Sequence, residues 1–114
     1  MSMTSSWRRC LGRTAFAATL LATGAAAQDA GTLADGRALL EANCSRCHAI
    51  DRTDESLHPE APAFRTLSER YPVSYLQEAL AEGIVTGHKD MPEFSAEPVQ
   101  VAAIIAYLES IQAQ

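Results

Sequence analysis

Hydrophobic residues recur with the spacing of one helix face near the C-terminus of the chain. The i, i+3, i+4, i+7, i+10 pattern is formed by Val101, Ile104, Ile105, Leu108 and Ile111. Before them, Ser95 is a suitable N-cap, and Pro98 is tolerated in a first helical turn. We therefore predict a C-terminal helix that is capped by Ser95 and buries this hydrophobic face.

Two further helices are indicated by capping signals. The sequence Thr32–Asp35 has the S/T-x-x-D/E form of a capping box, which predicts a helix over about 33–44. Ser74–Gln77 repeats the device before a second hydrophobic run, which Gly83 can end in a left-handed conformation. The stretch between these helices has little periodicity apart from a short helical turn at about 64–69. No strand and no internal repeat is indicated, so we predict an all-α fold.

The N-terminal segment has the pattern of a secretory leader. Arg8, Arg9 and Arg13 precede a hydrophobic run, 14–24, that contains no acidic residue. The run has about 11 residues, whereas a helix needs about 20 to span a bilayer. Ala25–Ala27 then supply an A-x-A cleavage site.

Cleavage near Ala27/Gln28 would divide the chain into a signal peptide, 1–27, and one exported domain, 28–114, which we expect in the periplasm. An uncleaved N-terminal anchor is the alternative. The twin arginines are only a weak signal for export in a folded state.

Composition limits what the remaining chain can be. The 114 residues are 47% hydrophobic and 20% charged, as in an ordinary globular protein, and they are too few for two domains. The formal net charge of -5 becomes -8 without the leader, which holds three of the nine basic residues and none of the 14 acidic ones. Nucleic-acid binding is therefore disfavoured. A domain of this size often needs a staple such as a metal or a cofactor.

The clearest chemical signal is the C-x-x-C-H motif Cys44-Ser45-Arg46-Cys47-His48, which is the attachment signature of c-type haem. Two thiols about one helical turn apart can reach the two vinyl groups on one edge of a porphyrin. The histidine that follows is then carried beneath the iron as an axial ligand. We therefore predict one covalent haem c, attached through Cys44 and Cys47 and ligated by His48.

Three other roles compete for the same residues. A disulfide between Cys44 and Cys47 would close a very small loop and stabilise the fold little. A thioredoxin-like redox pair normally follows a strand, and no period-two run precedes Cys44. A zinc site would need His58 and His88 as further ligands, without a second cysteine pair. The export signal in so short a chain favours haem.

Met91 is the only methionine outside the leader and the leading candidate for the distal iron ligand. Gly83 and Pro92 place it in a loop, whereas a helical methionine more often fills a core. A His/Met iron has a raised reduction potential and two closed axial positions, which implies electron transfer and not oxygen chemistry. The alternatives are an apolar anchoring role for Met91 and bis-histidine ligation through His88 or His58.

The order of these motifs resembles that of the small class I c-type cytochromes, over nearly all of residues 31–113. In that family an N-terminal helix leads into C-x-x-C-H, and a proline loop, a middle helix, a distal-methionine loop and a C-terminal helix follow. The matching parts here are Cys44–His48, Ala61-Pro62, the helix at Tyr75, Met91-Pro92 and the helix at Val101. The resemblance implies a cytochrome c-like fold, with three main helices and loops wrapped around one haem.

The same resemblance implies a close crossing of the terminal helices. Gly36 and Leu40 would meet Ile104 and Tyr107 there, with Gly36 allowing close approach. Leu40 stands where the family usually has an aromatic residue, so we expect a less tightly packed crossing.

The resemblance also implies partners for the haem and its ligand. The Pro62 carbonyl, with Pro59 as the competing candidate, would accept a hydrogen bond from His48. No tryptophan follows the leader to bind a haem propionate. That role is open among Arg52, Arg65, Tyr71, Tyr75 and Lys89.

The expected function is that of a periplasmic electron carrier, not an enzyme, whose iron cycles between the ferric and ferrous states. We expect a monomer without stable membrane insertion after cleavage. Its partners would be redox proteins: a dehydrogenase as the donor and an oxidase or respiratory complex as the acceptor. The alternatives are a dedicated cytochrome subunit of a periplasmic dehydrogenase and, in a different class, a haem-based gas sensor or peroxidase with an open distal site.

Overall fold

The described part of the chain is helical, as predicted. The computed structural model describes residues 23–84 and 89–113. Its elements, in chain order, are α1 (Thr23–Asn43), the 3-10 helices η1 (Phe64–Glu69) and η2 (Val73–Tyr75), α2 (Leu76–Glu82) and α3 (Pro98–Ile111). Within the described ranges there is no strand, and one isolated antiparallel bridge joins Ile84 to Phe94. The all-α fold class, the three main helices and the short helical turn at 64–69 are confirmed.

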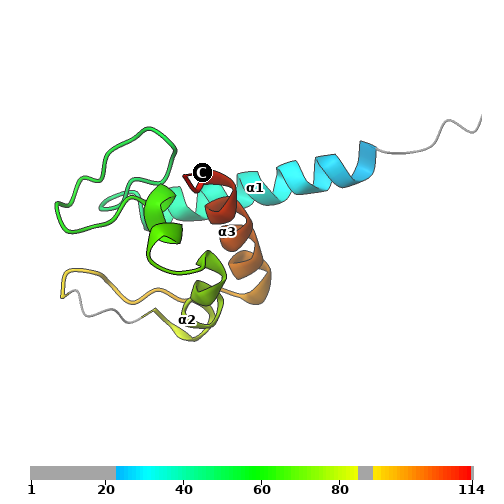
Figure 1. Ribbon diagram of the computed structural model, residues 1–114. Helices are drawn as coiled ribbons and strands as arrows, with labels where there is room; N and C mark the ends of the chain where they lie inside the picture. Colours follow the sequence, from blue (N-terminus) through cyan, green and yellow to red (C-terminus); the bar gives the residue numbers. More distant parts are fainter. Residues whose placement is uncertain (1–22, 85–88, 114) are drawn as a thin grey trace, which may run out of the picture.

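The first helix begins earlier than the sequence suggested. α1 starts at Thr23 and not near residue 33, so Thr32 lies inside the helix and Thr32–Asp35 does not cap its start. The alanine-rich sequence before Thr32 has high helix propensity, which explains why the helix extends through the capping signal. The predicted cleavage point before Gln28 lies within α1, and the described side chains of residues 29–32 are exposed. Figure 1 shows this end of α1 projecting from the rest of the fold.

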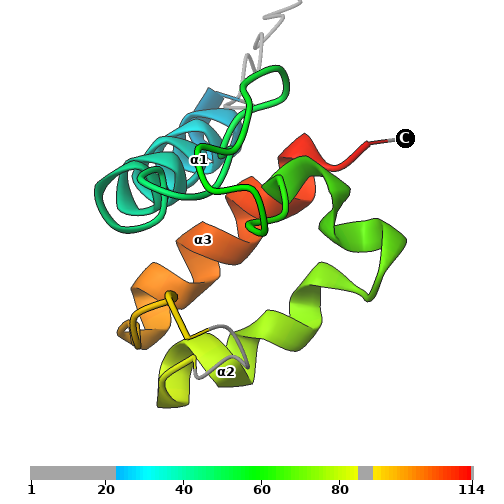
Figure 2. The same ribbon diagram turned by 90° about the vertical axis from the view of Figure 1, so that its left-hand side faces the viewer.

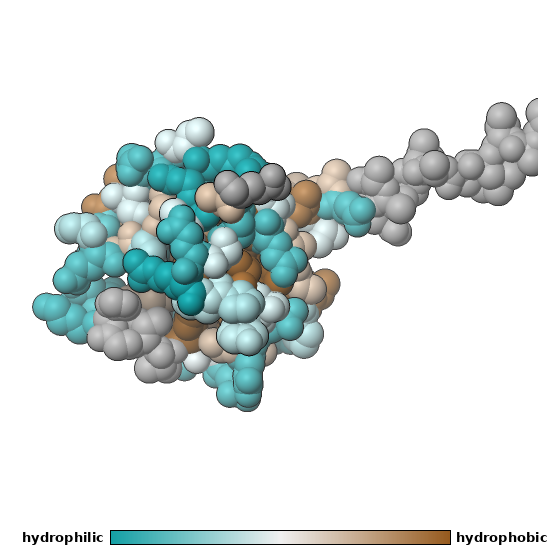
Figure 3. Space-filling model, viewed as in Figure 1, coloured by the Kyte–Doolittle hydropathy of each residue, from teal (hydrophilic) through white to brown (hydrophobic). Residues whose placement is uncertain are grey.

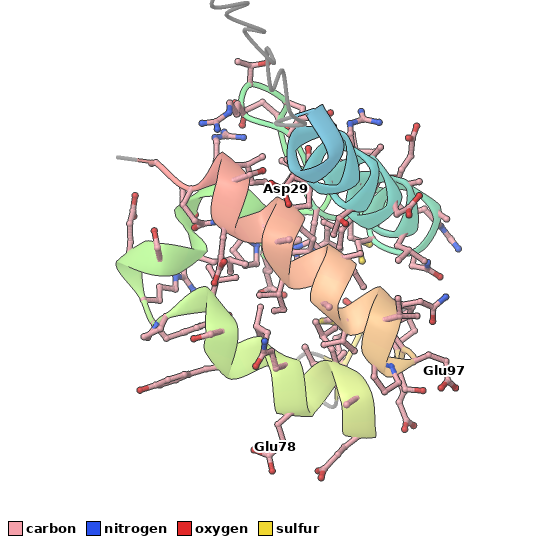
Figure 4. All side chains as sticks on the ribbon, turned by 90° about the vertical axis from the view of Figure 1, so that its right-hand side faces the viewer. Asp29, Glu78 and Glu97 are labelled. Atoms are coloured by element: carbon pink, nitrogen blue, oxygen red, sulfur yellow. The ribbon has the colours of Figure 1, made fainter. Side chains whose placement is uncertain are left out.

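The predicted serine caps of the other two helices are both wrong. A 3-10 turn precedes α2, whose N-cap is Tyr75 without a side-chain hydrogen bond, so Ser74 does not cap it. In α3 the N-cap is Glu97, two residues after Ser95. The side chain of Glu97 accepts a hydrogen bond from the Gln100 amide, and the Gln100 side chain accepts one from the Glu97 amide at 3.0 Å. This reciprocal pair lies at the exposed start of α3 (Figure 4).

Two predicted details of the helix ends are confirmed. Pro98 occupies the first turn of α3, where its missing amide hydrogen costs no helical hydrogen bond. Gly83 ends α2 with a φ of 108°, a conformation that side-chain-bearing residues rarely adopt. The chain therefore turns sharply after α2, toward the loop that carries Met91.

The crossing of α1 and α3 is the most extensive contact between elements. A Cβ atom built on Gly36 would lie 2.1 Å from the carbonyl oxygen of Ala103 and 2.9 Å from the Cβ of Tyr107. Only glycine fits at this point of closest approach. Leu40 and Ile104 are both buried in the same core cluster. The predicted close crossing at Gly36 is confirmed.

α3 is the central element of the fold. It packs against α1 on one side and against η1, η2 and α2 on the other, as Figure 2 shows. The hydrophobic core takes six side chains from α3 and one each from α1, the loop after α1, η1, η2 and α2: Leu40, Ile50, Leu67, Val73, Leu80, Val101, Ile104, Ile105, Tyr107, Leu108 and Ile111. Because α3 supplies more than half of this cluster, the loops and shorter helices are positioned chiefly by their packing against it.

Hydrophilic residues cover most of the face seen in Figure 3, with hydrophobic residues visible in small areas between them. The large hydrophobic residues that are well exposed are Leu57, Tyr75 and Val99. Among the described residues, no helix combines the length and the hydropathy needed to cross a membrane.

Candidate functional site

A single cavity brings the predicted site residues together. Its volume is about 440 Å³, and it lies between the end of α1, the loop that follows it, η1, α2, the Met91 loop and α3. The four residues predicted from the sequence to bind haem all line it: Cys44, Cys47, His48 and Met91. Leu40, Leu67, Leu80 and other hydrophobic side chains form much of the remaining wall. A flat apolar group with an iron at its centre fits this donor set and this wall.

The two cysteines lie in turns that continue directly from α1. The amide of Cys44 donates to the carbonyl of Leu40 at 2.8 Å, and the amides of Cys47 and His48 donate to the carbonyl of Cys44 at 3.1 and 3.0 Å. These helical turns keep both thiols and the imidazole on the cavity side of the chain. Both cysteines are free thiols, so the disulfide alternative is not what the structure contains.

The environment of Cys44 keeps its sulfur protonated. Burial is the main cause, and the neighbouring Cys47 adds to it, raising the pKa of the Cys44 thiol to about 11. Thiol nucleophilicity depends on the thiolate, so Cys44 is unreactive at neutral pH without further activation. This is opposite to the lowered thiol pKa of a thioredoxin-like redox pair.

His48 is oriented by two contacts. Its Nδ1 lies 2.8 Å from the carbonyl oxygen of Pro62. A carbonyl oxygen only accepts, so Nδ1 carries the hydrogen, and Nε2 is left with its lone pair. The ring also stacks on Phe64, with centroids 4.5 Å apart and planes 26° from parallel. Pro62, and not Pro59, is therefore the partner of His48, and this hydrogen bond leaves Nε2 available to a metal ion.

Met91 reaches the cavity on a loop closed by backbone hydrogen bonds. The amide of Ile84 donates to the carbonyl of Phe94 at 2.8 Å, and the amide of Ala96 donates to the carbonyl of Leu80 at 2.8 Å. The first bond joins the two ends of the loop to each other, and the second joins the loop to α2. Met91 is half-buried and lines the same cavity as His48, as a distal ligand must.

His58 and His88 are the two histidines that could bind the iron in place of Met91. His58 lines the cavity, but its Nδ1 accepts a hydrogen bond from the Glu60 amide at 3.2 Å and its Nε2 lies 3.5 Å from the Asp90 carboxylate. Both of its ring nitrogens thus have protein partners, which disfavours it as an iron ligand. His88 lies outside the described residues. Among the described residues, no group of three or more His, Cys, Asp or Glu side chains could hold a metal ion, and His88, which the zinc alternative requires, is not among those residues.

The positions of the five candidate side chains relative to the cavity reduce the number that could bind a haem propionate. Tyr71 and Lys89 line the cavity. Arg52 instead donates to the carbonyl of Ser110, and Arg65 donates to the carbonyl of Asp54 at 2.6 Å and pairs with acidic side chains nearby. Tyr75 is 73% exposed and is not part of the lining. Tyr71 and Lys89 are therefore the candidates that the structure leaves.

Two features were not predicted from the sequence, one in the cavity wall and one outside the cavity. Arg46 lines it, although nothing but its place between the two cysteines marks it in the sequence. The second feature is a cluster of Arg37, Asp51 and Tyr107, in which Asp51 joins α1 to α3. Its members are far apart in the sequence, so no local motif could have indicated it.

Comparison with known protein families identifies the family of this chain. Residues 31–108 match the family described as cytochrome C oxidase, cbb3-type, subunit III. The matched span covers more than half of the chain and includes the C-x-x-C-H motif, Met91 and most of α3. No curated protein and no solved structure gives a significant match.

Proposed function

Because the chain belongs to the cbb3-type subunit III family of c-type cytochromes, we propose that it is an electron carrier with one haem c, attached through Cys44 and Cys47 and ligated by His48 and Met91. Membership of the family identifies it as a haem-based electron-transfer protein. The observation that carries the finer proposal is the cavity, which all four of these side chains line. A single haem follows from the single C-x-x-C-H motif in the 114 residues.

Attachment needs only the two thiols and the vinyl groups of the porphyrin. Cys44 and Cys47 would hold the haem through thioether bonds, which their free thiols and the vinyl groups could form without an oxidant. Cys44 is fixed by its backbone bond to α1 and Cys47 by the turn that follows.

The residues that would hold the iron are His48 and Met91. When bound, the haem would supply a one-electron couple between ferric and ferrous iron. His48 would offer Nε2 as a nitrogen ligand, in an orientation held by the hydrogen bond from Nδ1 to the Pro62 carbonyl. Met91 would offer a soft thioether, which favours the ferrous state and raises the reduction potential. Since both ligand positions would then be taken by the protein, we propose that it is not an enzyme.

The partners that we propose are redox proteins of a respiratory chain. The description of the family supports an oxidase as the electron acceptor, and a dehydrogenase is the proposed donor. We place the protein in the periplasm, where c-type cytochromes function and where the N-terminal pattern would direct it. Interfaces between such partners are small and transient, which fits a fold whose exposed large hydrophobic residues are few in the described ranges.

The decisive experiment is mass spectrometry and optical spectroscopy of the full chain expressed with haem-maturation machinery. We expect the mass of the protein to exceed that of the polypeptide by one haem. Replacing both Cys44 and Cys47 by alanine should abolish this increase in mass. The ferric protein should show the weak long-wavelength band of methionine ligation, and Met91→Ala should abolish it. A His58→Ala variant is the matched control and should keep the band.

Two results would contradict the proposal in different ways. A product without a bound macrocycle would overturn haem attachment at this motif. A haem-loaded wild-type protein that is high-spin and binds carbon monoxide readily would overturn Met91 ligation and support the gas-sensor or peroxidase alternative.

A further inference from the structure

The segment His48–Asp51, which begins at the proposed iron ligand, is held in place by several hydrogen bonds. Ala49 is fully buried, and its amide donates to the hydroxyl of Ser56 at 2.9 Å. The two carboxylate oxygens of Asp54 accept the next two amides, at 2.9 Å each. The carbonyl of Ala49 accepts the amide of Phe64 at 2.9 Å. The backbone behind His48 thus has its hydrogen bonds satisfied within the protein.

The end of this segment is joined to both terminal helices through one carboxylate. Arg37 of α1 donates from Nε and Nη2 to the two oxygens of Asp51, at 3.0 and 2.8 Å. Tyr107 of α3 is buried, and its hydroxyl lies 2.6 Å from the same carboxylate and 3.1 Å from the carbonyl of Ile50. A bidentate arginine and a buried phenol therefore hold Asp51 from opposite helices.

The charges of this cluster favour the geometry seen. The hydrogen bond from Arg37, followed by that from Tyr107, lowers the pKa of Asp51 below its usual range. Burial and the contact with Asp51 raise the pKa of Tyr107 to about 12. At neutral pH, Asp51 is therefore an ionised acceptor and Tyr107 a neutral donor, which is the combination that the short contact requires.

We propose that Asp51 is a positioning residue for the axial imidazole: by fixing the segment behind His48 to α1 and α3, it sets the direction in which the ring faces the cavity. Pro62 fixes the Nδ1 side of the ring and the Phe64 ring covers one face. The amide of Phe64, Ser56 and Asp54 hold the backbone of the segment locally. Asp51 adds a different constraint, because it attaches this backbone to α1 and α3. This inference rests on the proposed function, because it takes His48 as the iron ligand.

The test uses the haem-loaded full chain and two variants that keep the shape of the side chain, Asp51→Asn and Tyr107→Phe. The measurements are the reduction potential and the hyperfine-shifted NMR signals of the His48 ring in the ferric protein. We expect both variants to shift the potential and the ring signals. The double variant should shift them by less than the sum of the two, since both substitutions break the same contact.

Two controls separate positioning from general destabilisation. Glu41→Gln removes the other carboxylate that pairs with Arg37 but does not touch the His48–Asp51 segment, so it should shift neither measurement. Val73→Ala lowers stability from a core position outside the cavity lining, and it should lower the melting temperature without moving the ring signals.

The proposal is overturned if Asp51→Asn and Tyr107→Phe lower the melting temperature but leave the potential and the His48 signals as in wild type. A shift of the same size in Val73→Ala would overturn it as well. If Asp51→Asn does not fold, the Tyr107→Phe variant alone tests the proposal, since it keeps the aromatic ring and its packing. If the wild-type chain binds no haem, the proposed function is contradicted instead. Haem binding by the wild-type chain is therefore measured before any variant is compared.

Discussion

Gly36 of α1 lies so close to Ala103 of α3 that a methyl group on Gly36 would stand 2.1 Å from the Ala103 carbonyl oxygen. Both residues belong to helices, so neither backbone can give way locally without moving a whole element. The crossing therefore depends on the absence of a side chain at one position.

Gly36→Ala should destabilise the protein, because α1 must move away from α3 to admit the methyl group. We expect a loss of about 1–3 kcal/mol in the free energy of unfolding, measured by urea denaturation. The control is Gly31→Ala in the same helix, where nothing lies within 4 Å of an added Cβ. That change should be neutral or stabilise by roughly 0.5–1 kcal/mol. Equal effects of the two substitutions would contradict the crossing.

Glu97→Ala should cost about 0.5–2 kcal/mol, because it removes the cap of α3 and leaves the Gln100 amide without its acceptor. Ser95→Ala is the matched control, since Ser95 is exposed and precedes the cap. Thermal unfolding of the two variants decides between the cap in the structure and the one suggested by the sequence. A larger loss of stability for Ser95→Ala than for Glu97→Ala would support Ser95 as the N-cap of α3.

The stabilising contribution of Asp51 should disappear in acid. Its pKa is lowered in the folded state by Arg37 and Tyr107, so the folded state holds the proton less tightly than the unfolded chain does. The contribution is therefore fully present above the unfolded pKa of about 4 and is lost as the pH falls through the folded pKa.

This dependence is checked by comparing wild type with Asp51→Asn by urea denaturation across pH 3–7. The difference in unfolding free energy should be largest near neutral pH and shrink below about pH 4. Glu109→Gln removes an exposed carboxylate from α3 and serves as the control for the general effect of net charge. A difference between wild type and Asp51→Asn that stays constant with pH would contradict the ionised state of Asp51.

Removal of residues 1–27 should leave the fold intact. The described side chains that follow, 29–32, are exposed, and the core contacts of α1 begin further along the helix. A chain that begins at Gln28 should therefore match the full chain in its haem spectrum and, to within a few degrees, in its melting temperature. N-terminal mass analysis of the exported protein tests the cleavage itself, and a product that retains the leader would support the uncleaved anchor.

The site residues that could be predicted from the sequence are those that lie close together in it. Cys44, Cys47 and His48 are neighbours in the sequence, and the turn that follows α1 directs all three to one cavity. The approach at Gly36 and the partner Pro62 were inferred from a resemblance, and the geometry confirms both. Ligation by Met91 stays a prediction, although its loop does bring it to the cavity.

The errors have a common physical origin, which is that capping signals are weak beside packing and propensity. Thr32 and Ser74 have suitable side chains, but helical or 3-10 backbone continues through both positions. Asp51 is one of 14 acidic residues in the sequence, and no motif distinguishes it from the others. Its role depends on Arg37 and Tyr107, 14 and 56 residues away, and no pattern in the sequence relates the three.

The loop that carries Met91 is joined at its base by two main-chain hydrogen bonds, from Ile84 to Phe94 and from Ala96 to Leu80. Main-chain bonds do not depend on the side chain at position 91, so that residue can be exchanged without removing either bond. A graft with histidine or a non-coordinating residue in place of Met91 would produce a set of proteins that differ in redox potential or in ligand access. The helical scaffold beneath them would be the same.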